Sequence, residues 1–494
     1  MERSSGILLH VTSLPGKYGI GTMGKEAFGF VDFLVAAGQK LWQILPLGHT
    51  GYGDSPYQCF SAFAGNPLII DLHKLVKTGL LTEEELPEDD HFPDDNVDYG
   101  KVFHYKYKLL GKAFDHFRKS SNKELKQQFE TFCKANKSWL EDYAIFMALK
   151  DHHQGRPWQE WSEQIKMREP DAIKRYSEYL AKEIEFYRFL QFVFYHQWLE
   201  LKAYANAHSI KIIGDLPLYV AFDSADAWAN PEIFDFDDSL TPRTVAGVPP
   251  DYFSKTGQLW GNPIYDWKYL QEHGFRWWID RIRANFLLYD ILRIDHFRGL
   301  AAYWSVPYGE KTAINGEWIE APGTAMLKAV YDALGEQPII AENLGVITPD
   351  VEEMREAFKM PGMKILQFAF DSGEENEFIP HTYDKNSVVY TGTHDNNTTL
   401  GWYHESSEQD KQNVRNYFCF EDDDPAWSFI RLAWSTVSNI AIAPMQDILR
   451  LGAETRMNFP GKSPGYWKWR YEKDMLTEKH AKDLLELTKT YGRI

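Results

Sequence analysis

The stretch YDILRIDHFRGL, residues 289–300, decides the fold because it shows how one buried strand ends. Its apolar run contains an arginine, Arg293, and a carboxylate, Asp295, follows the run at once. Charged side chains are almost never fully buried unless they are paired. Residues i and i+2 of a strand point to the same face, so we expect Arg293 and Asp295 to lie together at the end of this strand.

Seven other apolar runs also end on a polar or small residue. They are GILLHVTSLPG (6–16), LWQILPLG (41–48), IKIIGDLP (210–217), IIAENLG (339–345), MKILQFAFD (363–371), VVYTGTHDN (388–396) and NIAIAPMQD (439–447). Continuous apolar runs of this length are typical of strands buried on both faces, as in parallel sheets. Eight such runs predict an α/β protein with a (β/α)8 TIM barrel, whose active-site residues follow the C-terminal ends of the strands.

The spacing of the runs predicts two insertions in one catalytic barrel unit, residues 1–494. Residues 73–208, after the second strand, are too many for one barrel helix, and their apolar positions recur at helical intervals. We expect a mostly helical insertion there. Residues 222–282, after the third strand, are rich in Pro, Gly, Asn and Trp, which predicts a loop-rich insertion forming part of the active-site cleft.

Composition excludes several classes of partner. The chain has 71 acidic and 53 basic residues and a formal charge of −18, which disfavours nucleic acid and anionic membranes. The three scattered cysteines indicate a reducing compartment, and the N-terminal apolar run is too short for a signal peptide, so we expect a cytoplasmic protein. Without an HExxH motif or a Cys/His cluster, we expect no metal and no cofactor.

Three carboxylates end three of the predicted strands, namely Asp295, Glu342 and Asp395. Each alone could equally cap a helix or form an ion pair at the barrel rim. Together, with Arg293 and His394 beside two of them, they indicate a glycosidase-like site. A retaining site needs two carboxyl groups about 5–5.5 Å apart, and neighbouring strands lie about 4.7–4.9 Å apart. Asp295 and Glu342 therefore form the candidate pair.

The motifs RIDHFRG, AENLG, GTHDNNTTLGW and GDLPLYV carry a resemblance to a known family, as does the block GVPPDYFSKTGQLWGNPIYDW at 247–267. Over almost its whole length the chain resembles the 4-α-glucanotransferases, called amylomaltase or D-enzyme (glycoside hydrolase family 77, α-amylase clan). The resemblance implies that Asp295 is the nucleophile, Glu342 the acid/base and Asp395 the transition-state stabiliser.

The resemblance also implies a set of substrate-binding residues: Arg293, His394, Asp215, Tyr57, Ser55, Asp251, Tyr252, Phe253, Trp260 and Asn262. Alternatives stay open for some of them. Asp215 could have only a structural hydrogen-bonding role, Trp260 could belong to the core of the insertion, and Tyr252 with Phe253 could anchor a loop. The closing segment RMNFPGKSPGYWKWR, residues 456–470, also carries the resemblance, but Lys462 and Tyr466 depart there from the family pattern, which puts the contacts of this segment in doubt.

The expected function is retaining transfer of a 1,4-α-glucan segment to the 4-hydroxyl of an acceptor glucan or glucose. The implied partners are maltooligosaccharides and 1,4-α-glucans. The three carboxylates do not separate this reaction from α-amylase-type hydrolysis, because both share a covalent intermediate. Branching activity and a catalytically inactive glucan-binding protein are further alternatives.

Overall fold

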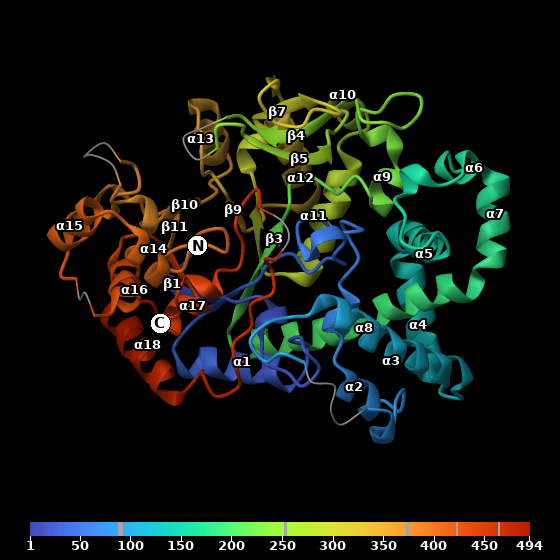
Figure 1. Cartoon of the computed structure of the whole chain (residues 1–494), viewed down its shortest axis with the longest axis horizontal. Coiled ribbons are helices and arrows are strands. Elements are labelled where there is room, and N and C mark those ends of the chain that lie inside the picture. Colours follow the sequence, from blue (N-terminus) through green and yellow to red (C-terminus); the bar gives the residue numbers. More distant parts are fainter. Residues whose placement is uncertain (87–91, 251–253, 372–375, 421–422, 463–464) are drawn as a thin grey trace.

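Eight parallel strands close into a barrel, which confirms the predicted (β/α)8 fold (Figure 1). The computed structural model describes residues 1–86, 92–250, 254–371, 376–420, 423–462 and 465–494. Around the barrel the strands are β1 (Ser4–Leu8), β2 (Leu41–Gln43), β3 (Lys211–Leu216), β6 (Ile291–Ile294), β9 (Ile339–Ala341), β10 (Gly362–Ile365), β11 (Ser387–Tyr390) and β12 (Ile440–Pro444). Each coincides with one of the eight apolar runs.

Helices cover the outside of the barrel. They include α1 (Lys25–Ala36), α8 (Ala181–Ala207), α11 (Arg276–Leu288), α12 (Gly323–Leu334), α13 (Pro349–Ala357), α14 (Thr399–Glu405), α15 (Glu408–Tyr417), α16 (Pro425–Ser435), α17 (Met445–Ile448) and α18 (Glu478–Thr490). Between β10 and β11 the described residues form only short 3-10 turns, at Leu366–Phe368 and Pro380–Thr382. The barrel is therefore less regular at this connection than at the others.

The range 73–208 is built from helices. They are α2 (Leu72–Lys77), α3 (Tyr99–Lys119), α4 (Lys123–Ala135), α5 (Lys137–His152), α6 (Glu163–Lys166), α7 (Pro170–Tyr179) and α8. Most of them lie to the right of the barrel in Figure 1. The long helix α8 packs against both the insertion and the barrel. It contacts α5 in the insertion, and α1 and β3 in the barrel.

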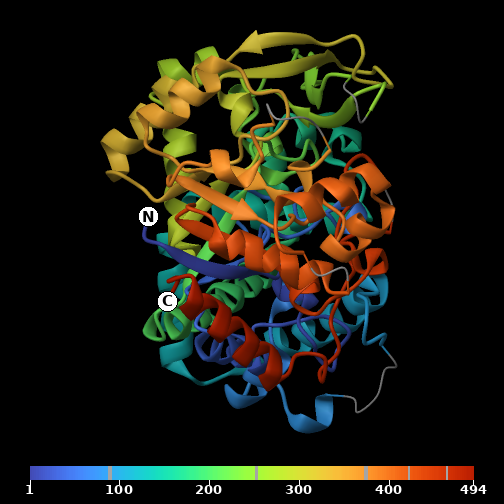
Figure 2. The same ribbon diagram turned by 90° about the vertical axis from the view of Figure 1, so that its left-hand side faces the viewer.

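A second, antiparallel sheet stands beside the barrel and lies at the top of both Figure 1 and Figure 2. Its order is β5 (Gln258–Pro263), β4 (Thr244–Val248), β7 (Ala302–Pro307) and β8 (Glu317–Glu320). Two of these strands and the short helices α9 (Ala225–Ala229) and α10 (Trp267–Glu272) lie in the range 222–282. This range therefore contains more regular structure than its Gly- and Pro-rich composition indicates.

Two arginines join the chain ends to the N-terminal end of the barrel strands, where N and C lie close together (Figures 1 and 2). Arg493 is fully buried and donates to main-chain oxygens of Trp434 (2.8 Å) and Ser4 (3.0 Å). Arg3 donates to the oxygens of Trp434 (3.1 Å) and Thr436 (2.9 Å). Burial lowers the pKa of Arg493 to about 9, and the nearby positive charge of Arg3 adds to this fall.

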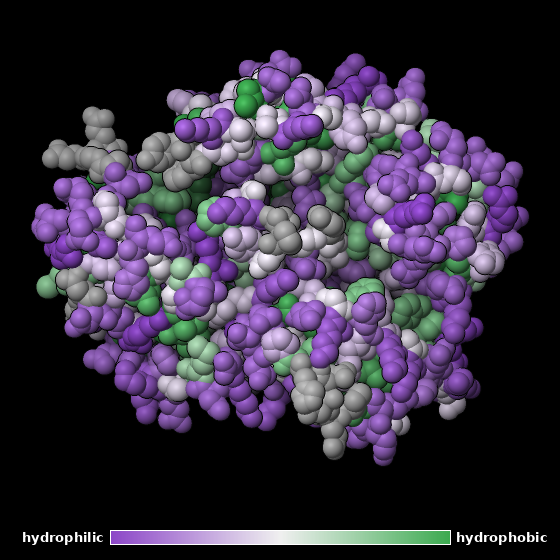
Figure 3. Space-filling model, viewed as in Figure 1, coloured by the Kyte–Doolittle hydropathy of each residue, from purple (hydrophilic) through white to green (hydrophobic). Residues whose placement is uncertain are grey.

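Hydrophilic side chains dominate the face of the molecule seen in Figure 3, in keeping with the large negative charge. Much of the hydrophobic surface visible there is recessed between the barrel and the neighbouring elements. In the described part of the chain, no helix is both long enough and apolar enough to cross a membrane.

Candidate active site

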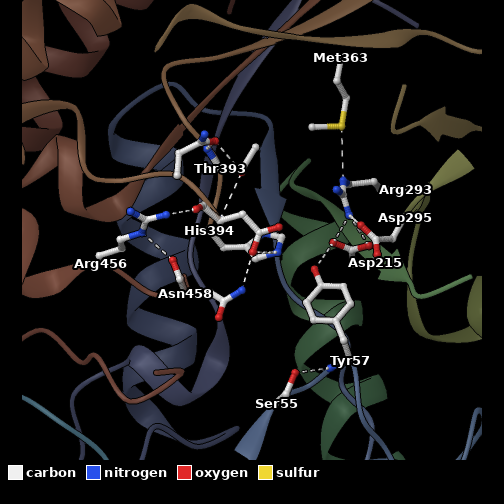
Figure 4. A network of polar contacts seen from close by, with 12 residues as sticks. Ser55, Tyr57, Asp215, Arg293, Asp295, Met363, Thr393, His394, Arg456 and Asn458 are labelled. Carbon is white, nitrogen blue, oxygen red and sulfur yellow. Dashed lines mark hydrogen bonds and ion pairs between the residues drawn. The ribbon is translucent and has the colours of Figure 1, made fainter. Parts of the chain in front are cut away.

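Arg293 is the centre of a buried charge network at the C-terminal ends of β3 and β6 (Figure 4). The register pairs Asp215 of β3 with Arg293 of β6. The Arg293 Nη1 donates to both oxygens of Asp215 (2.7 Å each) and to Asp295 Oδ1 (2.9 Å). Burial lowers the pKa of Arg293, but the two carboxylates outweigh it and hold this pKa well above its ordinary value. Arg293 therefore stays charged beside Asp295.

Glu342 follows β9, the strand next to β6, and the pair Ile294–Ala341 brings it level with Asp295. The Glu342 Oε2 accepts from the His296 N–H (2.7 Å), and Oε1 accepts from the Leu344 N–H (2.9 Å). Burial raises the pKa of Glu342 to about 8, and the charge of Asp295 adds to this rise, while Arg293 and the two N–H groups oppose it. Glu342 is therefore protonated at neutral pH.

The turn that directly follows Asp295 and contacts Glu342 has an unusual backbone. His296 adopts the left-handed conformation, with φ of 52°, which is uncommon for a residue other than glycine. This conformation directs the His296 N–H to Glu342, and the next N–H, of Phe297, donates to the Glu342 main-chain oxygen (3.1 Å). The turn that follows the first carboxylate thus fixes the second.

Asp395 follows β11 and is held by Arg456 and Asn458, two residues that were not among the predicted site residues. The Asn458 amide donates to Asp395 Oδ1 (2.6 Å), and Arg456 donates to the Asp395 main-chain oxygen. His394 Nε2 lies 3.4 Å from Asp395 Oδ1. Asn458 and Arg456 belong to the RMNFPG motif, so the only available signal was the family resemblance of that motif.

Tyr57 contacts both Asp215, at the end of β3, and His394, the neighbour of Asp395. Its hydroxyl donates to Asp215 Oδ2 (2.8 Å), and its ring stacks on His394 with centroids 5.3 Å apart and planes 16° apart (Figure 4). Ser55 accepts from the Tyr57 N–H (3.2 Å), so it orients Tyr57 through the backbone. Asp215 is 1% exposed, and its oxygens are engaged by Arg293 and Tyr57, an arrangement that agrees with the hydrogen-bonding role considered for it.

Residues of the second sheet reach the site to different degrees. Trp260 is half-buried, and its ring meets the His296 ring edge to face at 4.7 Å. Asn262 is 5% exposed and is used in the fold: it donates to the Val220 main-chain oxygen (2.8 Å) and accepts from Gln58 (3.3 Å). The contacts of Asn262 are thus to loop residues and not to the carboxylates.

Asp251, Tyr252 and Phe253 lie outside the described residues. The two departures from the family pattern both adjoin Phe459. Lys462 Nζ lies 3.7 Å from the centre of the Phe459 ring, and the Tyr466 ring is 6.3 Å away from it. Within the described ranges, no group of three or more His, Cys, Asp or Glu side chains could hold a metal ion.

A (β/α)8 barrel with three carboxylates at the ends of its strands defines the class of an enzyme that acts on glycosidic bonds. The family model of the 4-alpha-glucanotransferases (glycoside hydrolase family 77) matches residues 9–477. The chain belongs to this family. This result supports an enzyme of the 4-alpha-glucanotransferase kind over the hydrolase and binding-protein alternatives.

Individual proteins and structures agree with this assignment. The chain is 52% identical to a 4-alpha-glucanotransferase of Synechocystis, with 100% of this chain and 98% of that protein covered. It is 47% identical to the 4-alpha-glucanotransferase of Thermus thermophilus over the full length of both. The structure of an amylomaltase from Streptococcus agalactiae in complex with acarbose matches with a TM-score of 0.97 and 43% identity, covering 100% of both chains.

Proposed function

We propose that this enzyme transfers 1,4-α-glucan segments by a retaining mechanism in two steps. In the first step the Asp295 carboxylate attacks the anomeric carbon, the bond to the leaving sugar breaks, and Glu342 gives its proton to the leaving oxygen. In the second step Glu342 takes the proton of the acceptor's 4-hydroxyl. The acceptor oxygen then attacks the anomeric carbon, and Asp295 leaves as a carboxylate.

One observation carries this proposal: two carboxyl groups on neighbouring strand ends differ in their electrostatic surroundings. Asp295 Oδ1 accepts a hydrogen bond from the guanidinium of Arg293 at 2.9 Å, which holds and orients this carboxylate for attack. Glu342 has a pKa of about 8, so it carries the proton needed by the leaving group. A protonated carboxyl group beside one that is held by a guanidinium can divide the roles of acid and nucleophile in this way.

Asp395 is proposed to stabilise the positive charge that develops at the anomeric carbon. Its side chain is 40% exposed, so it can face a sugar while Asn458 holds one of its oxygens. The stacked rings of Tyr57 and His394 form a flat surface next to it. We propose that the sugar on the donor side of the cleaved bond binds against this surface. Asp215 supports the surface through its hydrogen bond with Tyr57, and Arg293 holds Asp215.

Transfer requires that the sugar acceptor, and not water, reaches the intermediate. We propose residues 1–494 as one catalytic unit in which the segment 222–282 forms one wall of the cleft. The contact of Trp260 with His296, next to Asp295, supports this placement. Asp251, Tyr252 and Phe253, which lie outside the described residues, stay proposed substrate-binding residues on the family resemblance alone.

Maltooligosaccharides and longer 1,4-α-glucans are the proposed donors and acceptors. The similarity to the amylomaltase solved with acarbose supports an oligosaccharide in this cleft. The three cysteines, Cys59, Cys133 and Cys419, are all unpaired, which supports a reducing compartment such as the cytoplasm.

Product analysis after incubation with maltotriose tests the function. Transfer should give glucose together with a ladder of maltooligosaccharides longer than maltotriose. Hydrolysis alone would give glucose and maltose without longer products, and this result would contradict the proposal. An Asp295→Asn variant, which should form neither set of products, is the control for contaminating enzymes.

A further inference from the structure

One buried carboxylate fastens both ends of the loop that follows β11. Asp447 lies in α17, directly after β12, and is 1% exposed. Its Oδ2 accepts from the hydroxyls of Thr391 (2.6 Å) and Thr399 (2.7 Å), and its Oδ1 accepts from the Thr399 N–H (2.8 Å). Thr391 comes immediately after β11, and Thr399 is the first residue of α14.

The loop between these two threonines carries His394 and Asp395. Inside it, Asn396 Oδ1 accepts from both the N–H and the hydroxyl of Thr393 (2.8 Å each), which closes a tight turn. The turn is therefore internally rigid. Its position relative to the barrel depends on where its two ends are held, together with the contacts that Arg456 and Asn458 make to Asp395.

We propose that Asp447 is a positioning residue, which places the Asp395 carboxylate at the anomeric carbon by clamping the two ends of this loop. The inference rests on the role proposed for Asp395. No described contact joins Asp447 to Asp395, so the effect is transmitted by the loop. A displacement of about 1 Å in a catalytic group can lower a rate by about 100-fold.

An amide in place of the Asp447 carboxylate removes the charge and changes the hydrogen-bond pattern with its three donors. An ionised carboxylate accepts on both oxygens, whereas an asparagine presents one oxygen and one NH2 donor. In Asp447→Asn, the amide oxygen can keep the Thr399 N–H only if both hydroxyls turn and accept weaker, uncharged hydrogen bonds from the NH2 group. We therefore expect the variant to fold with a loosened loop.

Kinetics with two donors separate positioning of Asp395 from an effect on Glu342. Asp395 is proposed to act in both steps, so Asp447→Asn should lower kcat about 10- to 100-fold with little change in KM. The loss should be the same with maltotriose and with a glucosyl fluoride, which needs no proton for its leaving group. A loss that the fluoride relieves would overturn the inference, because it would place the defect at Glu342.

A threonine pair tests the clamp without changing a buried charge. Thr391→Val removes the hydroxyl at nearly constant volume and should lower kcat, whereas Thr391→Ser keeps the hydroxyl and should restore it. Asp71→Asn is the matched control, because Asp71 is also buried and accepts from Thr22 Oγ1 (2.8 Å) and the Lys74 N–H (2.9 Å), with no site residue among these partners. It should lower the melting temperature and leave kcat unchanged.

A double-mutant cycle on the fluoride donor completes the test. Adding Asp447→Asn to Asp395→Asn should cause no further loss if Asp447 acts through Asp395. Independent, multiplying losses would overturn the inference, as would an unchanged kcat in folded Asp447→Asn or equal rates in the two Thr391 variants. Near-normal activity of Asp395→Asn alone would overturn the proposed role of Asp395 and this inference with it.

Discussion

The two ends of the barrel each bury an arginine but satisfy it differently. At the C-terminal end of the strands, Arg293 lies between the carboxylates of Asp215 and Asp295, and its pKa is raised. At the N-terminal end, the acceptors described for Arg493 are main-chain oxygens and the Thr436 hydroxyl, and its pKa is lowered to about 9. A guanidinium that pairs with a carboxylate can hold that carboxylate in place for a reaction. A guanidinium that donates to neutral oxygens only joins chain segments.

This difference agrees with the division of labour in (β/α)8 barrels, where chemistry occurs at one end and the other end contributes stability. Substitutions at the two ends should therefore separate activity from stability.

The largest effect is expected for Asp295→Asn. An amide cannot form the glycosyl ester, so turnover should fall on the order of 10⁴-fold or more. The melting temperature should change little, because the side chain is partly exposed and keeps its shape. Product analysis with maltotriose and a thermal melt check both points. Near-normal transfer would show that Asp295 is not the nucleophile.

The next effect concerns Glu342 and pH. Since its pKa is raised to about 8, the proton is present at pH 7 and is lost as the pH rises through about 8. The kcat/KM for maltotriose should therefore fall above about pH 8. Glu342→Gln should lower transfer between glucans about 10²- to 10⁴-fold.

With a glucosyl fluoride donor, the loss of rate in Glu342→Gln should be smaller. In the unsubstituted enzyme, the fall in the rate of the first step above about pH 8 should disappear with this donor. An equal loss with both donors would contradict the acid role.

At the opposite end, Arg493→Met should destabilise the protein by about 3 kcal/mol, because it removes several hydrogen bonds that a buried guanidinium donates to main-chain oxygens. The kcat of the folded variant should not change. Arg283→Met is the control: Arg283 is 53% exposed and pairs with Asp280, so its effect should stay within about 0.5 kcal/mol. Denaturant titration measures both. A fall in kcat for Arg493→Met would mean that the two ends are coupled.

The smallest effect should come from replacing Tyr252 and Phe253 together by alanine. If they cover the cleft, water gains access and the ratio of hydrolysis to transfer rises, while the melting temperature changes little. A lower melting temperature with an unchanged ratio would instead support the anchoring role. The amount of new reducing ends, divided by the amount of longer maltooligosaccharides, measures the ratio of hydrolysis to transfer.

The barrel could be predicted because its strands are buried on both faces, so the sequence shows each as an apolar run with a polar end. The Arg293–Asp295 contact also followed from local geometry, since residues i and i+2 share a face. The second sheet was not predicted. Its strands are short, and β4 and β5 contain glycines and half-buried positions that resemble a loop.

The rest of the site depends on register and on long-range contacts. Asp215 meets Arg293 because β3 and β6 pair in one particular register, which an apolar run does not specify. Asn458 reaches Asp395 from a segment 63 residues further along the chain. Asp447 ends the apolar run at 439–447, but its role could not be predicted from that run, because its partners belong to the preceding strand connection.

The pairing of β1 with β12 has a consequence for biosynthesis. Ser4 pairs with Ile440, so the first barrel strand is made long before its neighbour on one side. At translation rates of about 5–20 residues per second, roughly 20–90 s separate the two strands on the ribosome. If β1 pairs with β2 during that time, its other edge has no partner until β12 is made, and unpaired edges recruit other chains. Yield should therefore depend on whatever shields nascent β1, and slower synthesis would lengthen its exposure.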